Sequence, residues 1–445
     1  MRNATQFFRT IFLTVLALLF GLAAASSASQ IKLDVALGAP VMQAGKTQTA
    51  YLKVSLRGFE TPGESFRAPI NVAVVLDKSG SMQGEKIERA KQAAIMAISS
   101  LRSDDIISVI AYSDTVDVLV HAGRFNNRAD TAYRIGRIIS GGRTALFAGV
   151  SKGAYEVRKY LDQNRVNRVI LLSDGLANVG PSSASELGRL GASLGRDGMS
   201  VTTIGLGLGY NEDLMTQLAG YSDGNHAFAQ NASDLAEIFR NEFNSAKSVV
   251  AKELHIIIRC AGNIRPLRVM GRDAEIVGQT VRVDLNQLSS RQEKFVILEV
   301  EVPAGRVGES RNLASVDVSY LNLYTQRNDA LTDTVTVSFT ESSAKIKKSV
   351  NRKVMESAIE QVIILDSKEA VRLRDAGNIP AAKKKMQDSA DYLKDNARRY
   401  NSQRLEALER ETREDADSFG SEMDWNKNRK SIIEKQYKRE RQQVY

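Results

Sequence analysis

Oxygen-bearing side chains follow one apolar run of the sequence at alternate positions. Residues 72–76 are apolar, and Asp77, Ser79 and Ser81 come after them. No histidine or cysteine lies nearby, and oxygen-only sites suit hard cations such as Mg²⁺, Mn²⁺ or Ca²⁺. These three residues are therefore candidate ligands of a divalent metal ion. The alternative is an ordinary turn in which Asp and Ser cap neighbouring backbone groups.

Two later segments offer further oxygen donors, which such a site needs because one carboxylate holds a divalent ion poorly. Residues 140–146 form a glycine-rich loop that carries the hydroxyl of Thr144. Residues 169–172 form a second apolar run, and Asp174 follows it closely. The candidate metal ligands are therefore Asp77, Ser79, Ser81, Thr144 and Asp174.

The elements around these residues are expected to be strands and helices in alternation. The run at residues 72–76 is typical of a buried parallel strand, and residues 85–101 repeat apolar side chains at helical spacing. The alternation continues from about residue 70 to residue 245, which predicts a doubly wound α/β domain with a mainly parallel sheet. Strands at residues 106–112 and 116–120 are close enough to form an antiparallel hairpin at one edge. Such sheets bind ligands at the carboxyl ends of their strands.

The five candidate ligands together resemble the metal-ion-dependent adhesion site of von Willebrand factor A (VWA) domains. The family pattern is Asp-x-Ser-x-Ser, then a Thr in a Gly-rich loop, then an Asp after a later strand, and each position is filled in that order. The resemblance implies a Rossmann-like fold and a bound Mg²⁺ (or Mn²⁺ or Ca²⁺). In the family, the hydroxyls bind the metal directly and the Asp residues bind it directly or through water. An open position remains for an acidic group of a partner.

A second stretch carries the same resemblance. Residues 203–213, followed by Leu214 and Met215, are similar to a late strand-and-helix segment of bacterial VWA proteins, of the inter-alpha-trypsin-inhibitor heavy-chain-like and calcium-activated-chloride-channel-like types. In isolation, the glycines at 205, 207 and 209 suggest a dinucleotide-binding loop, but their spacing and late position do not match that motif. A flexible strand end that lets the next helix pack is the simpler interpretation.

The regions on either side of the central domain alternate apolar and polar residues with the period of a strand. Two such strands are expected within residues 29–66 and about five within residues 248–341. Five strands are too few to close a stable sandwich, whereas about seven are enough. The sequence therefore predicts that the domain at residues 67–247 is inserted into a β-sandwich built from both flanks.

The C-terminal part of the chain changes to helical periodicity. Residues 342–413 are expected to form an antiparallel helical hairpin, because a helix stop and restart fall at Gly377 and Pro380. A third helix is considered over residues 403–413. Residues 414–445 are polar with mixed charge and are expected to be a mobile tail.

Residues 1–28 have the pattern of a secretory signal peptide. Arg2 and Arg9 accompany a short apolar core at residues 11–22, and small residues that suit cleavage follow the core. An uncleaved anchor helix is the alternative, although the core is short for a bilayer of about 30 Å. We therefore expect an exported protein, located in the periplasm, at the cell surface or outside the cell.

Composition limits the chemistry that the chain can perform. Its 445 residues include 1 cysteine and 3 histidines, which rules out a disulfide framework within the chain and disfavours a zinc site or a Ser-His-Asp triad. The formal net charge of +9 is spread along the chain, and the sequence contains no recognisable nucleic-acid-binding module. This charge either favours association with an anionic cell envelope or simply serves solubility.

These features favour a non-enzymatic, metal-dependent protein-interaction module of the adhesion type. Its open metal position would bind a carboxylate of a protein partner. A metal-assisted hydrolase is the first alternative, but it needs a base near the bound water, and the nearest candidate, Asp114, fits better as a turn residue or a support for the ligands. A VWA partner of an ATPase is the second alternative, which export disfavours because ATP is scarce outside the cytoplasm.

Overall fold

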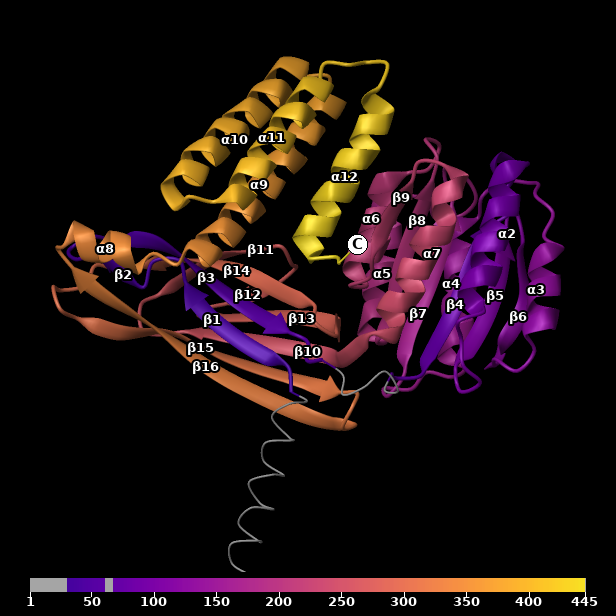
Figure 1. Ribbon diagram of the computed structural model, residues 1–445, viewed down its shortest axis with the longest axis horizontal. Coiled ribbons are helices and arrows are strands. Elements are labelled where there is room, and N and C mark those ends of the chain that lie inside the picture. The colour runs from indigo at the N-terminus through magenta and orange to yellow at the C-terminus, as the bar shows by residue number, and fades with distance from the viewer. Residues whose placement is uncertain (1–29, 61–66, 445) are drawn as a thin grey trace, which may run out of the picture.

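The computed structural model describes residues 30–60 and 67–444, so the predicted signal peptide lies outside the described residues. The described chain has three parts, which are a β-sandwich, a central α/β domain and a C-terminal group of helices (Figure 1). The sandwich and the α/β domain lie next to each other along the long axis of the molecule. The helices stand over the sandwich and reach the α/β domain through the last helix (Figure 1).

The inner strands of the α/β domain's sheet are apolar and β-branched runs that are buried on both faces. Every residue of β4 (Ile70–Asp77), β7 (Val166–Ser173) and β8 (Met199–Leu206) is buried. The strand order is β6-β5-β4-β7-β8-β9, and all neighbours are parallel except β5 and β6. The other strands are β5 (Ile106–Tyr112), β6 (Val116–Arg124) and β9 (His226–Ala229). The prediction of a mainly parallel α/β sheet is therefore confirmed.

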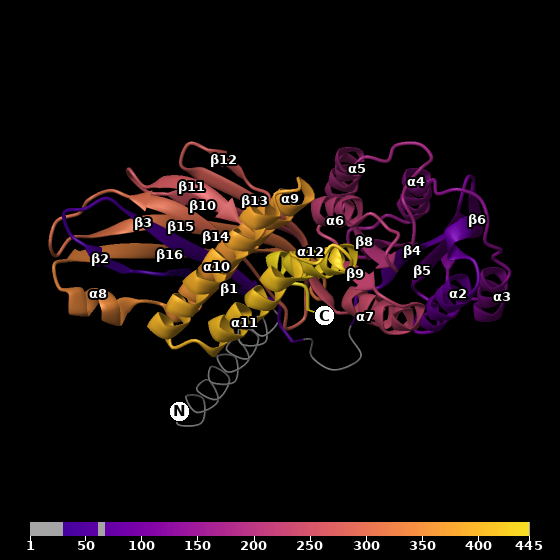
Figure 2. The same cartoon turned by 90° about the horizontal axis from the view of Figure 1, so that it is seen from above.

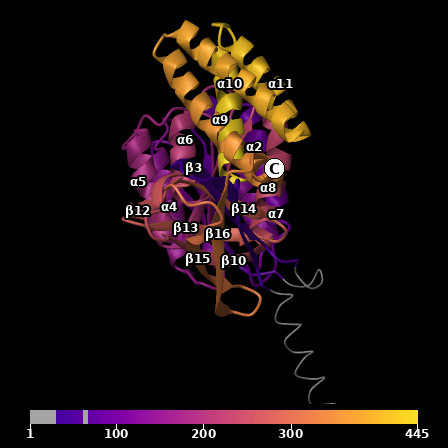
Figure 3. The same cartoon turned by 90° about the vertical axis from the view of Figure 1, so that its left-hand side faces the viewer.

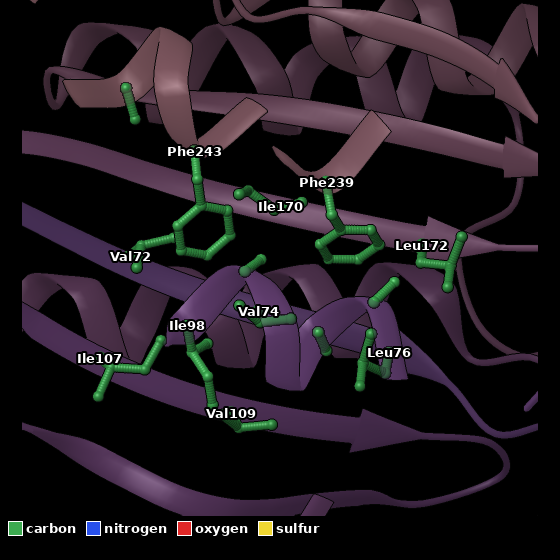
Figure 4. Close-up of a cluster of buried hydrophobic side chains, with 14 of the residues drawn as sticks. Val72, Val74, Leu76, Ile98, Ile107, Val109, Ile170, Leu172, Phe239 and Phe243 are labelled. Carbon is green, nitrogen blue, oxygen red and sulfur yellow. The ribbon is translucent and has the colours of Figure 1, made fainter. Parts of the chain in front are cut away.

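Helices cover both faces of this sheet (Figure 2). One face carries α2 (Glu85–Ile98), α3 (Arg128–Gly136) and α7 (Leu235–Lys247), and the other carries α4 (Leu146–Arg158), α5 (Ala184–Arg196) and α6 (Glu212–Tyr221). Short 3₁₀ helices, η1 (Gly80–Met82) and η2 (Ala232–Asp234), precede α2 and α7. Phe239 and Phe243 of α7 pack on Val74 and Ile170 in the core of the first face (Figure 4). The buried apolar core thus fixes the strands whose ends carry the candidate ligands.

The β-sandwich is built from strands on both sides of the α/β domain. Its four-stranded sheet has the order β1-β3-β14-β11, with β1 (Lys32–Leu37), β3 (Gln48–Arg57), β14 (Glu293–Val302) and β11 (Arg265–Met270). Its six-stranded sheet has the order β12-β13-β10-β15-β16-β2, with β12 (Glu275–Val277), β13 (Thr280–Ser289), β10 (Val249–Cys260), β15 (Ser310–Asn322), β16 (Arg327–Thr340) and β2 (Val41–Gln43). The inward residues of both sheets share one core.

The longest link between the two flanks is the pairing of β3 with β14. These strands are antiparallel from Arg57 opposite Glu293 to Gln48 opposite Val302. The chain therefore leaves the sandwich after β3, forms the α/β domain and returns at β10. The boundaries expected at residues 67 and 247 fall between β3 and β4 and at the junction of α7 with β10.

The C-terminal region contains the expected helical hairpin, with its turn at Gly377 and Pro380, and continues with further helices in place of a mobile tail. It comprises α8 (Ser343–Ser349), α9 (Arg352–Asp375), α10 (Ile379–Tyr400), α11 (Gln403–Ser418) and α12 (Trp425–Arg441). Figure 3 shows α9, α10 and α11 above the sandwich strands. The expected mobile tail at residues 414–445 is wrong for the part that the structure describes, because α11 runs to Ser418 and α12 follows it.

Sequence periodicity did not predict helix α12, because several of its polar residues are buried against partners elsewhere in the chain. Lys430 and Gln436 are buried along with Ile432, Ile433 and Tyr437. Such a helix lacks a broad apolar stripe, so its periodicity alone is typical of a solvated segment. Among residues 30–60 and 67–444, no helix combines the length and the apolar character that crossing a membrane requires.

Candidate metal centre

The carboxyl ends of β4 and β7 lie side by side because these two strands are hydrogen-bonded neighbours. Asp77 is the last residue of β4, and Asp174 directly follows β7. The backbone N–H of Ser79 donates to Asp77 Oδ1 at 2.8 Å, which holds the loop after β4 in a tight turn. The local sequence thus places two carboxylates and two serines at one edge of the sheet.

Oxygen atoms from the two strand ends lie within hydrogen-bonding distance of one another. The Oγ atoms of Ser79 and Ser81 are 3.0 Å apart, and Ser81 Oγ donates to Asp174 Oδ1 at 2.6 Å. Asp77 Oδ2 accepts a hydrogen bond from Ser173 Oγ at 2.7 Å. The predicted ligands that the structure brings together here are Asp77, Ser79, Ser81 and Asp174.

The glycine-rich loop brings Thr144 to the same place. The backbone N–H of Gly80 donates to Gly142 O at 2.9 Å. This bond joins the glycine-rich loop to the loop after β4 that carries Ser79 and Ser81, called the serine loop below. A Cβ atom placed on Gly175 would lie 3.3 Å from Ser81 Oγ and 3.4 Å from Thr144 Oγ1. The hydroxyls of Thr144 and Ser81 therefore both lie next to Gly175. All the candidate ligands predicted from the sequence lie on three adjoining loops.

The family model of the von Willebrand factor type A domain matches residues 71–241. The matched segment starts within β4 and contains the serine loop, the glycine-rich loop and the end of β7. Residues 71–241 are a VWA domain.

Relatives and solved structures agree with this assignment. The chain is 28% identical over 244 residues to the uncharacterized protein sll0103 of Synechocystis sp., a match that covers 53% of this chain and 57% of that protein. It is 28% identical over 181 residues to the human inter-alpha-trypsin inhibitor heavy chain H2, covering 39% of this chain and 19% of that protein. The chain therefore spans about half the length of the first relative and about a fifth of the second.

The fold of the chain is also shared by a solved structure, a von Willebrand factor type A protein from Catenulispora acidiphila. That structure aligns with a TM-score of 0.71 at 17% identity and covers 88% of this chain and 91% of its own. At this low identity the likeness concerns the fold. The predicted resemblance to VWA domains is confirmed, and an inter-alpha-trypsin inhibitor heavy chain is among the relatives.

The five candidate ligands Asp77, Ser79, Ser81, Thr144 and Asp174 are called the VWA centre below. Its two carboxylates are hidden from solvent. Asp77 is 0% exposed and Asp174 is 1% exposed. Burial raises the pKa of Asp77, the negative charge of Asp174 acts in the same direction, and the hydrogen bonds from Ser79 and Ser173 oppose this increase. A nearby positive charge would stabilise the ionised pair.

Lys86 supplies one such charge, and the sequence did not reveal it. Its ammonium forms an ion pair with Asp174 Oδ2, although the two residues are 88 positions apart. A lysine in the first turn of an expected helix is typical of a solvated side chain, so no local pattern indicated this contact. Ser173 and Tyr112, whose hydroxyls contact Asp77 Oδ2, were also missed as contributors.

Asp114, the base candidate of the hydrolase alternative, supports the glycine-rich loop instead. Its carboxylate accepts hydrogen bonds from Arg143 N at 2.9 Å and Arg143 Nε at 2.7 Å. The bonds from Arg143 lower the pKa of Asp114, which makes this carboxylate a weak base. Its contacts match the expected role of a turn residue that supports the ligand loops.

The donor set of the VWA centre fits a hard divalent ion. All its side-chain donors are hydroxyl or carboxylate oxygens, which Mg²⁺ and Mn²⁺ prefer. Two buried carboxylates face the single ammonium of Lys86, so the centre retains an excess of negative charge that a cation would neutralise. Within the described ranges, no three side chains of the His, Cys, Asp and Glu types form a metal-binding group. The centre would therefore depend on its hydroxyls.

Proposed function

We propose that this chain is an exported protein-interaction module of the adhesion type, whose VWA centre holds a divalent ion and binds an acidic group of a protein partner. The observation that supports the proposal is the convergence of oxygen donors from three loops, all of them buried except Ser81, with more negative charge than Lys86 balances. VWA domains are commonly protein-interaction modules, and the metal dependence is the specific part of the proposal.

Each residue of the centre would have a distinct task in holding the ion. The hydroxyls of Ser79, Ser81 and Thr144 would be direct neutral ligands, and Asp77 and Asp174 would supply negative charge directly or through water. When bound, the ion supplies an incompletely neutralised positive charge that attracts a carboxylate. The neutral hydroxyls matter because they leave more of that charge for the partner.

Recognition fits this centre better than hydrolysis does. A hydrolase would need a base that is free to accept a proton from bound water. The carboxylate of Asp114 is engaged by Arg143, and its pKa is lowered by that contact. We therefore propose a non-enzymatic role, with a partner carboxylate as the ligand.

Export is proposed from the N-terminal sequence alone. The short apolar core with Arg2 and Arg9 is typical of a signal peptide. The full chain has a net charge of +9, which becomes +7 when Arg2 and Arg9 leave with the signal peptide, and this charge would also attract the exported protein to an anionic cell envelope. Intact-mass measurement of the protein from its native host should show the loss of 25 to 28 N-terminal residues, and a soluble cytoplasmic protein that retains Met1 would contradict export.

Metal-dependent partner capture tests the interaction itself. The full mature chain is immobilised and exposed to an envelope extract with Mg²⁺, and a parallel sample contains a chelator. The proposal predicts a bound protein that is released by the chelator and is absent from the Asp174→Ala variant. The Asp197→Ala variant is the matched control, because Asp197 pairs with Arg158 on the surface, away from the ligand loops. Capture that survives both chelator and Asp174→Ala would contradict a metal-mediated contact.

A further inference from the structure

Lys86 places a fixed positive charge inside the VWA centre. Its Nζ pairs with Asp174 Oδ2, and the Asp174 side chain is 0% exposed whereas that of Lys86 is 38% exposed. The other oxygen of the same carboxylate, Oδ1, accepts the bond from Ser81 Oγ at 2.6 Å. Both oxygens of Asp174 are therefore already engaged by this chain.

The position of Lys86 is unfavourable for a cation except for this ion pair. Lys86 lies in the first turn of α2 (Glu85–Ile98), and the positive end of the helix dipole disfavours an ammonium there. The chain nevertheless directs this side chain inward, under the loop between β8 and α6, where a Cβ on Gly207 would lie 4.0 Å from Lys86 Nζ. Asp174 is thus the group that makes the placement favourable.

We infer that the Lys86 ammonium is a built-in counter-cation that stabilises the metal-free centre and competes with the divalent ion for Asp174. This inference rests on the proposed metal site. A metal ion that takes Asp174 must displace the ammonium or accept a positive charge beside it, and two positive charges at such close range repel strongly. The lysine would therefore set a lower limit on the metal concentration at which the module becomes competent to bind its partner.

The test compares variants of the full chain by calorimetric titration with MnCl₂ at one pH. Lys86→Met removes the ammonium but keeps the length of the side chain, and the expected result is a Mn²⁺ affinity about tenfold or more above that of the wild type. Lys86→Arg keeps the charge and should stay near the wild type. Lys78→Met is the matched control, because Lys78 lies in the loop directly after β4 but pairs with Asp117 at 3.2 Å rather than with a candidate ligand.

A second readout needs no metal affinity. In the presence of a chelator, Lys86→Met should melt at a lower temperature than the wild type, because Asp174 loses its counter-cation. Addition of Mn²⁺ should remove this difference in melting temperature. Lys78→Met should show neither effect.

The outcomes separate this inference from the metal site itself. Wild-type Mn²⁺ binding combined with unchanged or weaker binding by Lys86→Met would overturn the competition while leaving the metal site in place. An equal gain in Lys78→Met would overturn it too, by showing a general charge effect. Binding by Lys86→Met alone would support the inference strongly, and absence of binding by every variant would overturn both proposals.

Discussion

Asp77 combines two tasks at the end of β4 because its two carboxylate oxygens have different partners. Oδ1 accepts the backbone N–H of Ser79 at 2.8 Å and so shapes the loop. Oδ2 accepts the hydroxyl of Ser173 at 2.7 Å and so joins β4 to β7. Removing the whole side chain would therefore disturb the loop as well as the charge, whereas an amide would preserve much of the shape.

Asp77→Asn should consequently lose Mn²⁺ binding without losing the fold. Burial raises the pKa of Asp77, so ionising this carboxyl costs more free energy here than in water, and an amide avoids that cost. The melting temperature in chelator should be equal to or higher than that of the wild type. Asp77→Ala should also lose binding, but it leaves buried donors unpaired and should cost about 1–3 kcal/mol of unfolding free energy.

Calorimetric titration with Mn²⁺ and thermal melts in chelator check both variants together. Wild-type Mn²⁺ affinity in Asp77→Asn would show that the loops do not converge on an ion. A large loss of stability in Asp77→Asn would show that the carboxylate is needed for folding rather than for the metal.

The candidate ligands could be picked out from the sequence because each of them follows a local signal. Asp77 and Asp174 end apolar runs, the serines follow at alternate positions, and Thr144 lies in a Gly-rich loop. Lys86 could not be predicted, because its only distinguishing feature is a partner 88 residues away. Contacts of that kind depend on how helix α2 is rotated on the sheet, which residue spacing leaves undetermined.

At the scale of elements, α12 protects the free edge of the VWA sheet. Edge strands present unpaired backbone groups, and natural proteins cover them. Phe228 N of β9 donates to Glu434 Oε1 at 3.0 Å, and His226 N donates to Gln443 Oε1 at 3.1 Å. The C-terminal region thus covers the edge that β9 would otherwise leave open.

The same helix also holds the loop that leads from β8 into α6. Lys430 is 2% exposed at its position on α12, its Nζ donates to Tyr210 O at 3.0 Å, and it pairs with Glu212. Lys430→Met should lower the free energy of unfolding by about 2–4 kcal/mol, because it leaves a buried carboxylate with one partner fewer. Lys427→Met, a change at an exposed position of the same helix, is the control and should have little effect.

Urea denaturation of the two variants gives the comparison. Equal stabilities would show that α12 contributes little to the VWA domain. The buried face of α12 is held by ion pairs as well as by apolar residues. This mixed face is the reason why sequence periodicity did not predict α12, and it is also what the experiment probes.

At the scale of the whole molecule, the β-sandwich ties the two ends of the VWA domain together. The pairing of β3 with β14 buries Val296, Leu298 and Val300 at 0% exposure. A fragment of residues 67–341 lacks β1, β2 and β3, so it should expose these side chains and an open strand edge, and it should aggregate.

A fragment of residues 67–247 should remain soluble but melt at a lower temperature than the full chain, because β9 loses its cover from α12. Size-exclusion chromatography and thermal melts distinguish the two fragments. A fragment of residues 67–341 that is monomeric and melts cooperatively would show that the N-terminal strands are dispensable for the sandwich.

A buried lysine links the sandwich to the VWA domain and makes their joint stability depend on pH. Lys252 of β10 is 3% exposed, and its Nζ donates to Gln163 O at 3.0 Å and Arg165 O at 2.7 Å. Burial lowers the pKa of Lys252 from 10.5 to about 8. Between these pH values the unfolded chain binds more protons than the folded chain, so the free energy of unfolding rises with pH.

This contribution should amount to about 3 kcal/mol across the pH range from 8 to 10.5. Denaturation curves for the wild type and Lys252→Met, measured at several pH values in that range, isolate it from the titration of other groups. The wild type should gain stability relative to the variant as the pH rises. A difference between the two proteins that stays constant with pH would contradict the assigned pKa.

In the proposed metal centre, three loops of the VWA domain converge on one divalent ion. Anomalous scattering from crystals of the full chain grown with Mn²⁺ tests it most directly, because it locates the ion. We expect a peak within about 2.4 Å of the hydroxyl oxygens of Ser79 and Ser81, beside Thr144 and the two carboxylates. Crystals in which Mn²⁺ scatters only at other positions, with the five side chains ordered and no peak among them, would contradict it.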